Sequence, residues 1–145
     1  MDAFPHHYTV TASGTTSQSQ VIVSSKGVSD IATDAPAEFG GPGDQWSPEA
    51  LIMAAVADCF VLSFRAIARA SKVDWTTIQC EATGTLDRVD RKNQFTAIEL
   101  KVTVATPEGI AEDKLLKVLQ KSEESCLITN SMNATVSLVT DMHIG

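Results

Sequence analysis

The fold is decided by residues 47–70, which read SPEALIMAAVADCFVLSFRAIARA. Ser47 suits the N-cap of a helix, Pro48 its first position, and Glu49 the positive end of the helix dipole. From Ala50 onward the pattern is apolar almost all round, and a helix without a wet face belongs inside a protein. The stretch therefore predicts a long central helix, covered by a sheet or by a second subunit.

Strands and a second helix are predicted on the two sides of this central helix. Before it, residues 7–12 and 20–25 are rich in β-branched side chains and predict a β-hairpin, whereas residues 29–45 show no period. After it, the pattern predicts two long strands, an amphipathic helix and a final strand, at residues 77–87, 94–106, 112–124 and 134–141. This order of elements predicts an α+β fold, formed as a single domain over residues 1–145.

Composition limits the partners that the protein can have. The chain has 145 residues, is 43% hydrophobic and 20% charged, and carries a formal net charge of −7. This balance predicts a globular protein without a basic patch for nucleic acid or an anionic membrane. The N-terminus lacks a secretory signal pattern, and the longest apolar stretch, residues 50–64, is interrupted by Asp58 and predicted too short and too charged to span a membrane. We therefore expect a cytoplasmic protein with neither nucleic-acid nor membrane partners.

Three cysteines, Cys59, Cys80 and Cys126, are candidates for either core packing or chemistry. They are too few and too scattered for a disulfide framework, and no Cys-x-x-Cys pair indicates a zinc site. Cys80 shares one face of its predicted strand with apolar neighbours, which favours core packing. A buried thiol is by default an inert small hydrophobe, so periodicity alone leaves the other two roles open. The three histidines lie near the two termini, where we expect surface positions and no metal site.

Two spaced motifs resemble those of the OsmC/Ohr family of bacterial organic hydroperoxide reductases. The first is the pair Pro48 and Glu49, followed ten residues after the glutamate by Cys59 in the predicted central helix. The second is the segment from Cys126 to Asn130, which matches the family's Cys-Pro-x-Ser type segment in position and partly in chemistry. The resemblance implies an OsmC-like fold, with antiparallel sheets around a long buried central helix in an intertwined homodimer.

The resemblance also implies roles for three residues. Cys59 is implied to be the peroxidatic cysteine, which reduces an organic hydroperoxide to an alcohol and becomes a sulfenic acid. Cys126 is implied to be the resolving cysteine, which forms a disulfide that an external dithiol, lipoyl-type or a small thiol, reduces again. Glu49 is implied to belong to the network that activates the attacking thiolate. Neither a metal nor an organic cofactor is implied.

One part of the family pattern is missing from this chain. In the family an arginine before the central helix stabilises the thiolate, whereas Lys26 is the only Lys or Arg among residues 1–64 here. Arg65 and Arg69, of either subunit, are candidates to replace it. Two alternatives therefore stay open beside the peroxidase. One is a non-catalytic protein that binds a small ligand, and the other is a redox sensor whose cysteines switch contacts between subunits.

Overall fold

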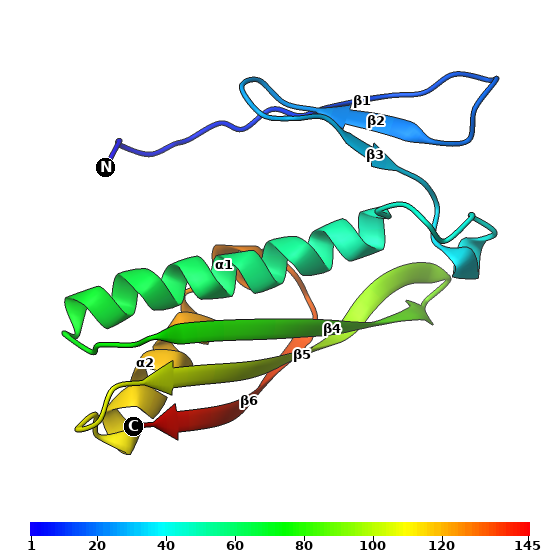
Figure 1. Cartoon of the computed structure of the whole chain (residues 1–145). Coiled ribbons are helices and arrows are strands. Elements are labelled where there is room, and N and C mark those ends of the chain that lie inside the picture. The colour runs from blue at the N-terminus through cyan, green and yellow to red at the C-terminus, as the bar shows by residue number, and fades with distance from the viewer. The chain divides into compact units, whose positions relative to one another are not determined.

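The computed structural model describes the whole chain from Met1 to Gly145, which divides into two compact units, Met1–Ile52 and Met53–Gly145. The boundary falls within the central helix α1, Pro48–Ala70. Each unit contains a three-stranded sheet, and Figure 1 labels the strands of both. The expected mixture of helices and strands is confirmed, and the assignment of residues 1–145 to a single domain stays a prediction.

The first unit contains a small antiparallel sheet of short strands. These are β1 (Thr11–Ser13), β2 (Val21–Ser24) and β3 (Ile31–Thr33), hydrogen-bonded in that order. The predicted hairpin is therefore confirmed, with shorter strands than expected. β3 and the 3-10 turn η1 (Ala37–Phe39) lie in the stretch without a period, because elements of three residues are too short to show one.

Helix α1 begins where the sequence predicts. The side-chain oxygen of Ser47 accepts a hydrogen bond from the backbone N–H of Ala50 at 3.1 Å, which satisfies a free donor of the first turn. Its 23 residues continue past Asp58 and end at Ala70, so the predicted length of the central helix is confirmed. By length and composition alone the helix could cross a membrane, with a mean hydropathy of 2.0 over its most apolar window.

The second unit is built on a long hairpin. β4 (Thr77–Val89) and β5 (Lys92–Thr106) pair in antiparallel fashion over almost their whole length. The turn between them consists of Asp90 and Arg91, whose positive φ angles of 50° and 67° suit a tight two-residue turn between twisted strands. Both strands were predicted, at residues 77–87 and 94–106, and the structure extends each of them by two residues into the connection.

The third strand of this sheet departs from the expected antiparallel arrangement. The chain passes through α2 (Glu112–Glu124) and α3 (Leu127–Asn130) before it enters β6 (Thr135–Ile144). β6 then pairs with β5 in parallel, so the sheet is mixed and the expectation of purely antiparallel sheets was wrong here. The reason is the helical crossover, which returns the chain to the end of the sheet where β5 starts.

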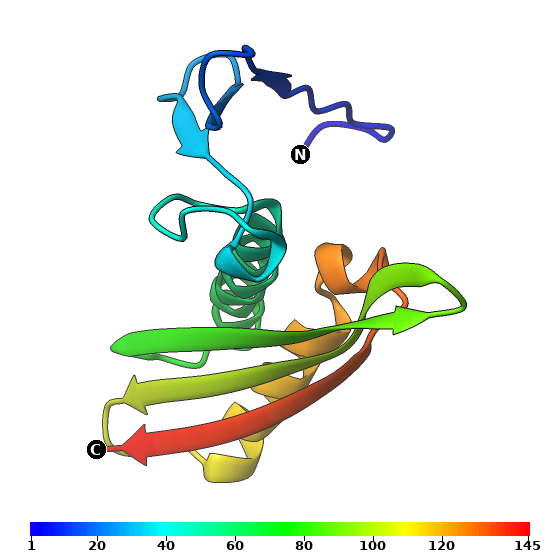
Figure 2. The ribbon, with the colours of Figure 1, turned by 90° about the vertical axis from the view of Figure 1, so that its right-hand side faces the viewer.

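The core of the second unit lies between the sheet and its two longer helices. α1 contributes a row of residues four apart, β5 contributes alternate residues, and α2 contributes its apolar face, and all of these are buried: Val56, Phe60, Phe64, Ala68, Ile98, Leu100, Val102, Val104, Leu115, Val118 and Leu119. Alternate residues of a strand point to the same face of its sheet. Because the buried residues of β5 are alternate ones, both helices cover the same face of the sheet. Figure 2 shows α2 passing behind the three strands.

Only this one row of α1 is fully buried by the chain itself. Leu62, on another side of the helix, is 51% exposed. The all-round burial that the apolar sequence predicts is therefore not reached within a single chain. The buried row still identifies α1 as a core helix of the kind found in soluble proteins.

Gly84 on β4 occupies a position where a side chain does not fit. A Cβ atom there would lie 2.7 Å from the Sδ atom of Met53 and 2.9 Å from the ring of Phe95. Because these side chains must move, we expect Gly84→Ala to lower the free energy of unfolding by about 1–3 kcal/mol, measured by urea denaturation. Gly14→Ala is the control, since its Cβ would meet only Val21, at 3.9 Å. Equal losses in the two variants would contradict the close packing at Gly84.

Candidate functional site

The structure brings Cys59 and Cys126 together from different elements. Cys59 lies on α1 and is partly exposed, whereas Cys126 is fully buried at the N-cap of α3. The thiol of Cys59 lies close enough to that of Cys126 to stabilise its thiolate as a hydrogen-bond partner. Both cysteines are free thiols, so the pair is in its reduced form.

The short helix α3 positions Cys126, and the sequence did not predict this helix. The backbone N–H of Asn130 donates to the carbonyl of Cys126 at 3.0 Å, and the hydroxyl of Thr129 donates to the same carbonyl at 3.2 Å. These bonds hold Cys126 at the start of the helix. Thr129 was missed as a site residue, although the family's Cys-Pro-x-Ser type segment also has a hydroxyl three residues after its cysteine.

The surroundings of Cys126 lower the pKa of its thiol. Burial raises the pKa of this thiol, but the hydrogen bonds that the backbone and the hydroxyl of Thr129 can donate to the thiolate act in the opposite direction. The thiol of Cys59 and the backbone of Ile128 add to that effect, and the resulting pKa is below the ordinary thiol value. The sequence alone does not predict this property, because it depends on donors that only the fold places around the sulfur.

Thr129 offers a direct test of this electrostatic arrangement. We expect Thr129→Val to raise the pKa of Cys126, because the variant loses the hydroxyl, whereas Thr129→Ser keeps the hydroxyl and should leave the pKa near that of the parent. The pH dependence of the cysteine 13Cβ chemical shifts measures each thiol separately. Since the parent pKa lies below the ordinary value, its thiolate should form at lower pH than in Thr129→Val. Coincident curves for Thr129→Val and the parent would contradict the assigned hydrogen bond.

Cys80 is a third thiol in the same neighbourhood. It lies partly buried on β4 and packs against the core, as its strand face predicts. Burial, with a smaller contribution from the charge of Cys126, raises the pKa of Cys80 to about 11. Cys80 therefore stays protonated near neutral pH and is a poor nucleophile.

Cys59 lines a largely apolar pocket of about 480 Å³ within the second unit. The lining comes from α1 and the start of α3, namely Ala55, Asp58, Cys59, Leu62, Ser63, Ala66, Leu127 and Ile128. The volume is within the range of sites for small molecules. Asp58 is the only charged residue in this lining, and neither Arg65 nor Arg69 contributes to it.

Glu49 lies in the first unit and is not part of the pocket of Cys59. It belongs to the first turn of α1 and lines a separate cavity of about 630 Å³. Its Oε1 atom is buried and has no hydrogen-bond partner. Of the three site residues suggested by the sequence, the structure thus brings Cys59 and Cys126 together. The third, Glu49, has a buried oxygen without a hydrogen-bond partner.

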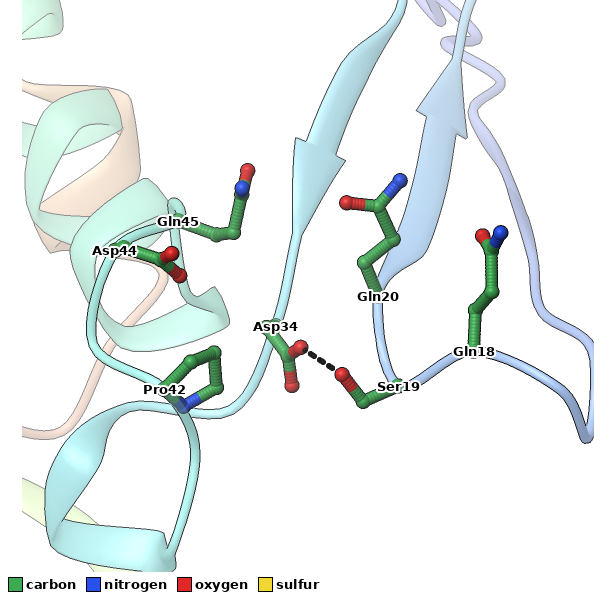
Figure 3. Close-up of a pocket in the computed structure, with 7 residues that line it drawn as sticks. All are labelled: Gln18, Ser19, Gln20, Asp34, Pro42, Asp44 and Gln45. Atoms are coloured by element: carbon green, nitrogen blue, oxygen red, sulfur yellow. Dashed lines mark hydrogen bonds between the residues drawn. The ribbon is translucent and has the colours of Figure 1, made fainter.

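A polar pocket of the first unit lies next to that cavity and contains none of the predicted site residues. It has a volume of about 450 Å³ and is lined by Gln18, Ser19, Gln20, Asp34, Pro42, Asp44 and Gln45 (Figure 3). Asp34 lines both spaces, and both of its oxygens are occupied. Oδ2 accepts a hydrogen bond from the hydroxyl of Ser19 at 2.7 Å, and Oδ1 accepts one from the N–H of Ala35 at 2.7 Å. Both carboxylate oxygens of Asp34 therefore have hydrogen-bond partners, whereas Oε1 of Glu49 has none.

The histidines and carboxylates form no cluster of metal ligands. No three side chains among His, Cys, Asp and Glu lie where they could hold one ion. His143 instead pairs with Asp141 on the surface, with Nε2 3.0 Å from Oδ2.

The second unit thus places a partly exposed thiol, Cys59, beside a buried one, Cys126, within an α+β fold. A family profile described as OsmC-like protein matches residues 41–141, which include Glu49 and all three cysteines. The chain belongs to this family. The family assignment suggested by the spaced motifs is therefore confirmed.

Related sequences span the fold to different extents. The chain is 22% identical to the uncharacterized protein YmaD of Bacillus subtilis (strain 168) over 136 residues, which are 92% of this chain and 91% of that protein. It is 33% identical to peroxiredoxin OsmC of Escherichia coli (strain K12) over 92 residues, or 63% of this chain. That match spans 64% of the E. coli protein.

Solved structures agree with the fold over nearly the whole chain. An OsmC-like protein of unknown function from Vibrio cholerae matches with a TM-score of 0.82 at 20% identity, covering 95% of this chain and 99% of that one. An organic hydroperoxide resistance protein from Elizabethkingia anophelis matches with a TM-score of 0.76 at 18% identity, covering 98% and 99% of the two chains. At such identities the likeness establishes the fold, which is the OsmC/Ohr fold.

Proposed function

We propose that the protein is a cysteine-based peroxidase that reduces organic hydroperoxides to alcohols, with Cys59 as the attacking thiol and Cys126 as the resolving thiol. The observation that carries the proposal is the position of Cys59, which lines an apolar pocket while its thiol lies beside that of Cys126. The similarity to proteins named peroxiredoxin OsmC and organic hydroperoxide resistance protein supports it.

The reaction proceeds in two steps at the sulfur of Cys59 and one exchange step. The Cys59 thiolate attacks the outer oxygen of the hydroperoxide, an S–O bond forms while the O–O bond breaks, and protonation of the leaving alkoxide gives the alcohol. The thiol of Cys126 then displaces water from the Cys59 sulfenic acid and forms a disulfide. An external dithiol, lipoyl-type or a small thiol, reduces this disulfide by exchange. The cycle needs neither a metal nor an organic cofactor.

Burial supports this division of roles between the two cysteines. Cys59 is partly exposed in the pocket, whereas Cys126 has no exposed surface. A substrate in the pocket therefore meets Cys59 first. The lowered pKa of Cys126 suits the second step, because the thiolate is the form that attacks a sulfenic acid.

We propose a cytoplasmic homodimer as the working form. Leu62 and Leu127, which line the pocket of Cys59, are 51% and 65% exposed in the single chain. A second copy that covers these side chains would also close the pocket against water. In this arrangement Glu49 belongs to the activating network, and Arg65 or Arg69 of either subunit supplies the positive charge that residues 1–64 lack.

Mass spectrometry of the reduced protein tests the proposal directly. After one equivalent of cumene hydroperoxide, we expect the loss of two thiol hydrogens and a cross-linked peptide that joins Cys59 to Cys126. Hydrogen peroxide, tested in parallel, should react more slowly because it has no hydrocarbon part to fill the apolar pocket. An unreactive Cys59, or a cross-link through Cys80 instead, would contradict the proposed chemistry.

One observation favours a second candidate function. No Lys or Arg lines the pocket of Cys59, so the chain itself provides no cation next to a thiolate there. No such cation would be needed in a non-catalytic protein that binds a small apolar ligand in this pocket. The same holds for a redox sensor without turnover. An unreactive Cys59 with saturable ligand binding would support the first of these. Oxidation that changes the oligomeric state without sustained peroxide consumption would support the second.

A further inference from the structure

From the lining of the Cys59 pocket we infer that Asp58 sets a charge preference, so that the site takes neutral or cationic organic hydroperoxides and discriminates against those that carry a carboxylate. Its substrates are those of the proposed function, on which the inference rests. The charge preference itself is a property of the pocket and can be measured without peroxidase turnover.

Asp58 lies on the same face of α1 as Cys59. The residues that α1 contributes to the pocket follow one another at spacings of one, three and four that place them on one face of the helix: Ala55, Asp58, Cys59, Leu62, Ser63 and Ala66. The row of α1 that contains Phe60 and Phe64 is buried in the core instead. A substrate that brings its hydroperoxide group to the Cys59 thiol therefore lies in the same pocket as the Asp58 carboxylate.

The wall around this carboxylate is largely apolar. Apart from Asp58, the lining consists of aliphatic side chains, the thiol of Cys59 and one hydroxyl, that of Ser63. Apolar walls lower the local dielectric constant and strengthen the field of a single carboxylate within a cleft. This field repels a second carboxylate and attracts an ammonium group, whereas the hydrocarbon part of every substrate meets the same aliphatic surface.

No cation of the chain pairs with Asp58. The chain contains one ion pair, between His143 and Asp141. Arg65 lies seven residues after Asp58, which is about 10 Å along the helix axis. The formal net charge of −7 acts in the same direction as Asp58, and a second copy of the chain would add the same excess of carboxylates.

Three hydroperoxides that differ in charge test the preference. They are cumene hydroperoxide and its para-carboxylate and para-aminomethyl derivatives, compared by kcat/KM in a dithiothreitol-fed assay at pH 7 and physiological ionic strength. We expect the cationic substrate to exceed the anionic one by at least about fivefold, with the neutral substrate between them, as for unit charges that share a partly solvated cleft. Equal values would overturn the inference, as would be found if an arginine of a second subunit neutralised Asp58.

Variants of matched charge separate Asp58 from the general attraction of a cation to an acidic protein. Asp58→Asn should reduce the cation-to-anion ratio to less than about twofold, and Asp58→Lys should invert it. Any effect of these substitutions on the fraction of Cys59 thiolate is common to the three substrates and cancels in the ratio. A ratio that survives Asp58→Asn would overturn the inference.

Glu81→Gln and Glu81→Lys are the matched controls. Glu81 is exposed on β4 between Cys80 and Ala82, which pack against the core, so it lies on the face of the sheet turned away from α1. Because salt screens exposed charges beyond about 8 Å, both controls should keep the parent ratio. An equal fall of the ratio in Glu81→Gln and Asp58→Asn would contradict the role of Asp58.

A second measurement needs no peroxidase activity. In the variant Cys80→Ser/Cys126→Ser, Cys59 is the one remaining thiol, and its rates of reaction with trimethylammonioethyl and sulfonatoethyl methanethiosulfonate can be compared. We expect the cation-to-anion ratio of these rates to fall at least about threefold when Asp58→Asn is added. An unchanged ratio would overturn the inference.

The two measurements distinguish a failure of the charge preference from a failure of the proposed function. If no hydroperoxide is consumed while the thiol reagents show a preference that depends on Asp58, the peroxidase proposal fails and the charge preference of the pocket stands. If the three hydroperoxides are consumed with equal kcat/KM, the peroxidase proposal stands and the charge preference fails.

Discussion

Cys59→Ser is expected to abolish the consumption of cumene hydroperoxide in a dithiol-fed assay, down to the rate without protein. The physical reason is that serine cannot form the sulfenic acid on which the later steps depend. Cys126→Ser should behave differently and release one equivalent of alcohol before it stops. Its Cys59 sulfenic acid has no neighbouring thiol to attack it and should accumulate, trapped by dimedone, or proceed to overoxidised forms.

Cys80→Ser is the matched control for both cysteine variants. It removes a thiol of the same neighbourhood whose pKa is raised to about 11, so the first oxidation and the later turnover should both keep their parent rates. Equal activity in Cys59→Ser and the parent would end the assigned mechanism. If only Cys126→Ser blocked the first oxidation, the roles of the two cysteines would be reversed.

Phe60→Ala is expected to lower the free energy of unfolding by about 3–5 kcal/mol. The side chain is fully buried in the core between α1 and the sheet, beside the row formed by Val56 and Phe64. Its removal loses the transfer free energy of the ring and leaves a cavity that the packed sheet cannot fill. Since small domains are stable by about 5–15 kcal/mol, the loss is a large part of the total.

Denaturation of the reduced protein, followed by far-UV circular dichroism at one fixed protein concentration, measures this loss. Val139→Ala on β6 is the control, because its side chain is 47% exposed and truncation there leaves no enclosed cavity. We expect a change below about 1 kcal/mol for the control. If Phe60→Ala lowered the free energy of unfolding no more than the control Val139→Ala does, this row of α1 would not form the core.

Elements that are long and clearly delimited were predictable from the sequence. Helix α1 has an N-cap at Ser47 and a proline at its first position, and α2 has the predicted bounds Glu112–Glu124. β4 and β5 alternate over many residues, which is enough for a period to appear. β3 and α3 were missed because elements of three or four residues contain no complete period. The parallel pairing of β6 was missed because a strand's own sequence does not indicate the direction of its neighbour.

The candidate site was predictable only in part. The spaced motifs indicate Cys59, Cys126 and Glu49 as the residues to examine, and local sequence can go no further than spacing and residue type. Thr129 acts on the sulfur of Cys126 through a turn of α3 that no periodicity predicts. The unpaired Oε1 of Glu49 likewise depends on how strands and loops of the first unit surround it.

By itself, the sequence determined the class of fold, the central helix, the family and the two cysteines that its motifs single out. These properties follow from local periodicity, capping and spacing, which are present in the sequence and do not depend on tertiary packing. Only the tertiary structure decided that Cys126 is buried with a lowered pKa while Cys59 lines a pocket. The physical reason is that burial and hydrogen bonding at a sulfur are set by groups far apart in the chain, which meet only when α1, α3 and the sheet have packed.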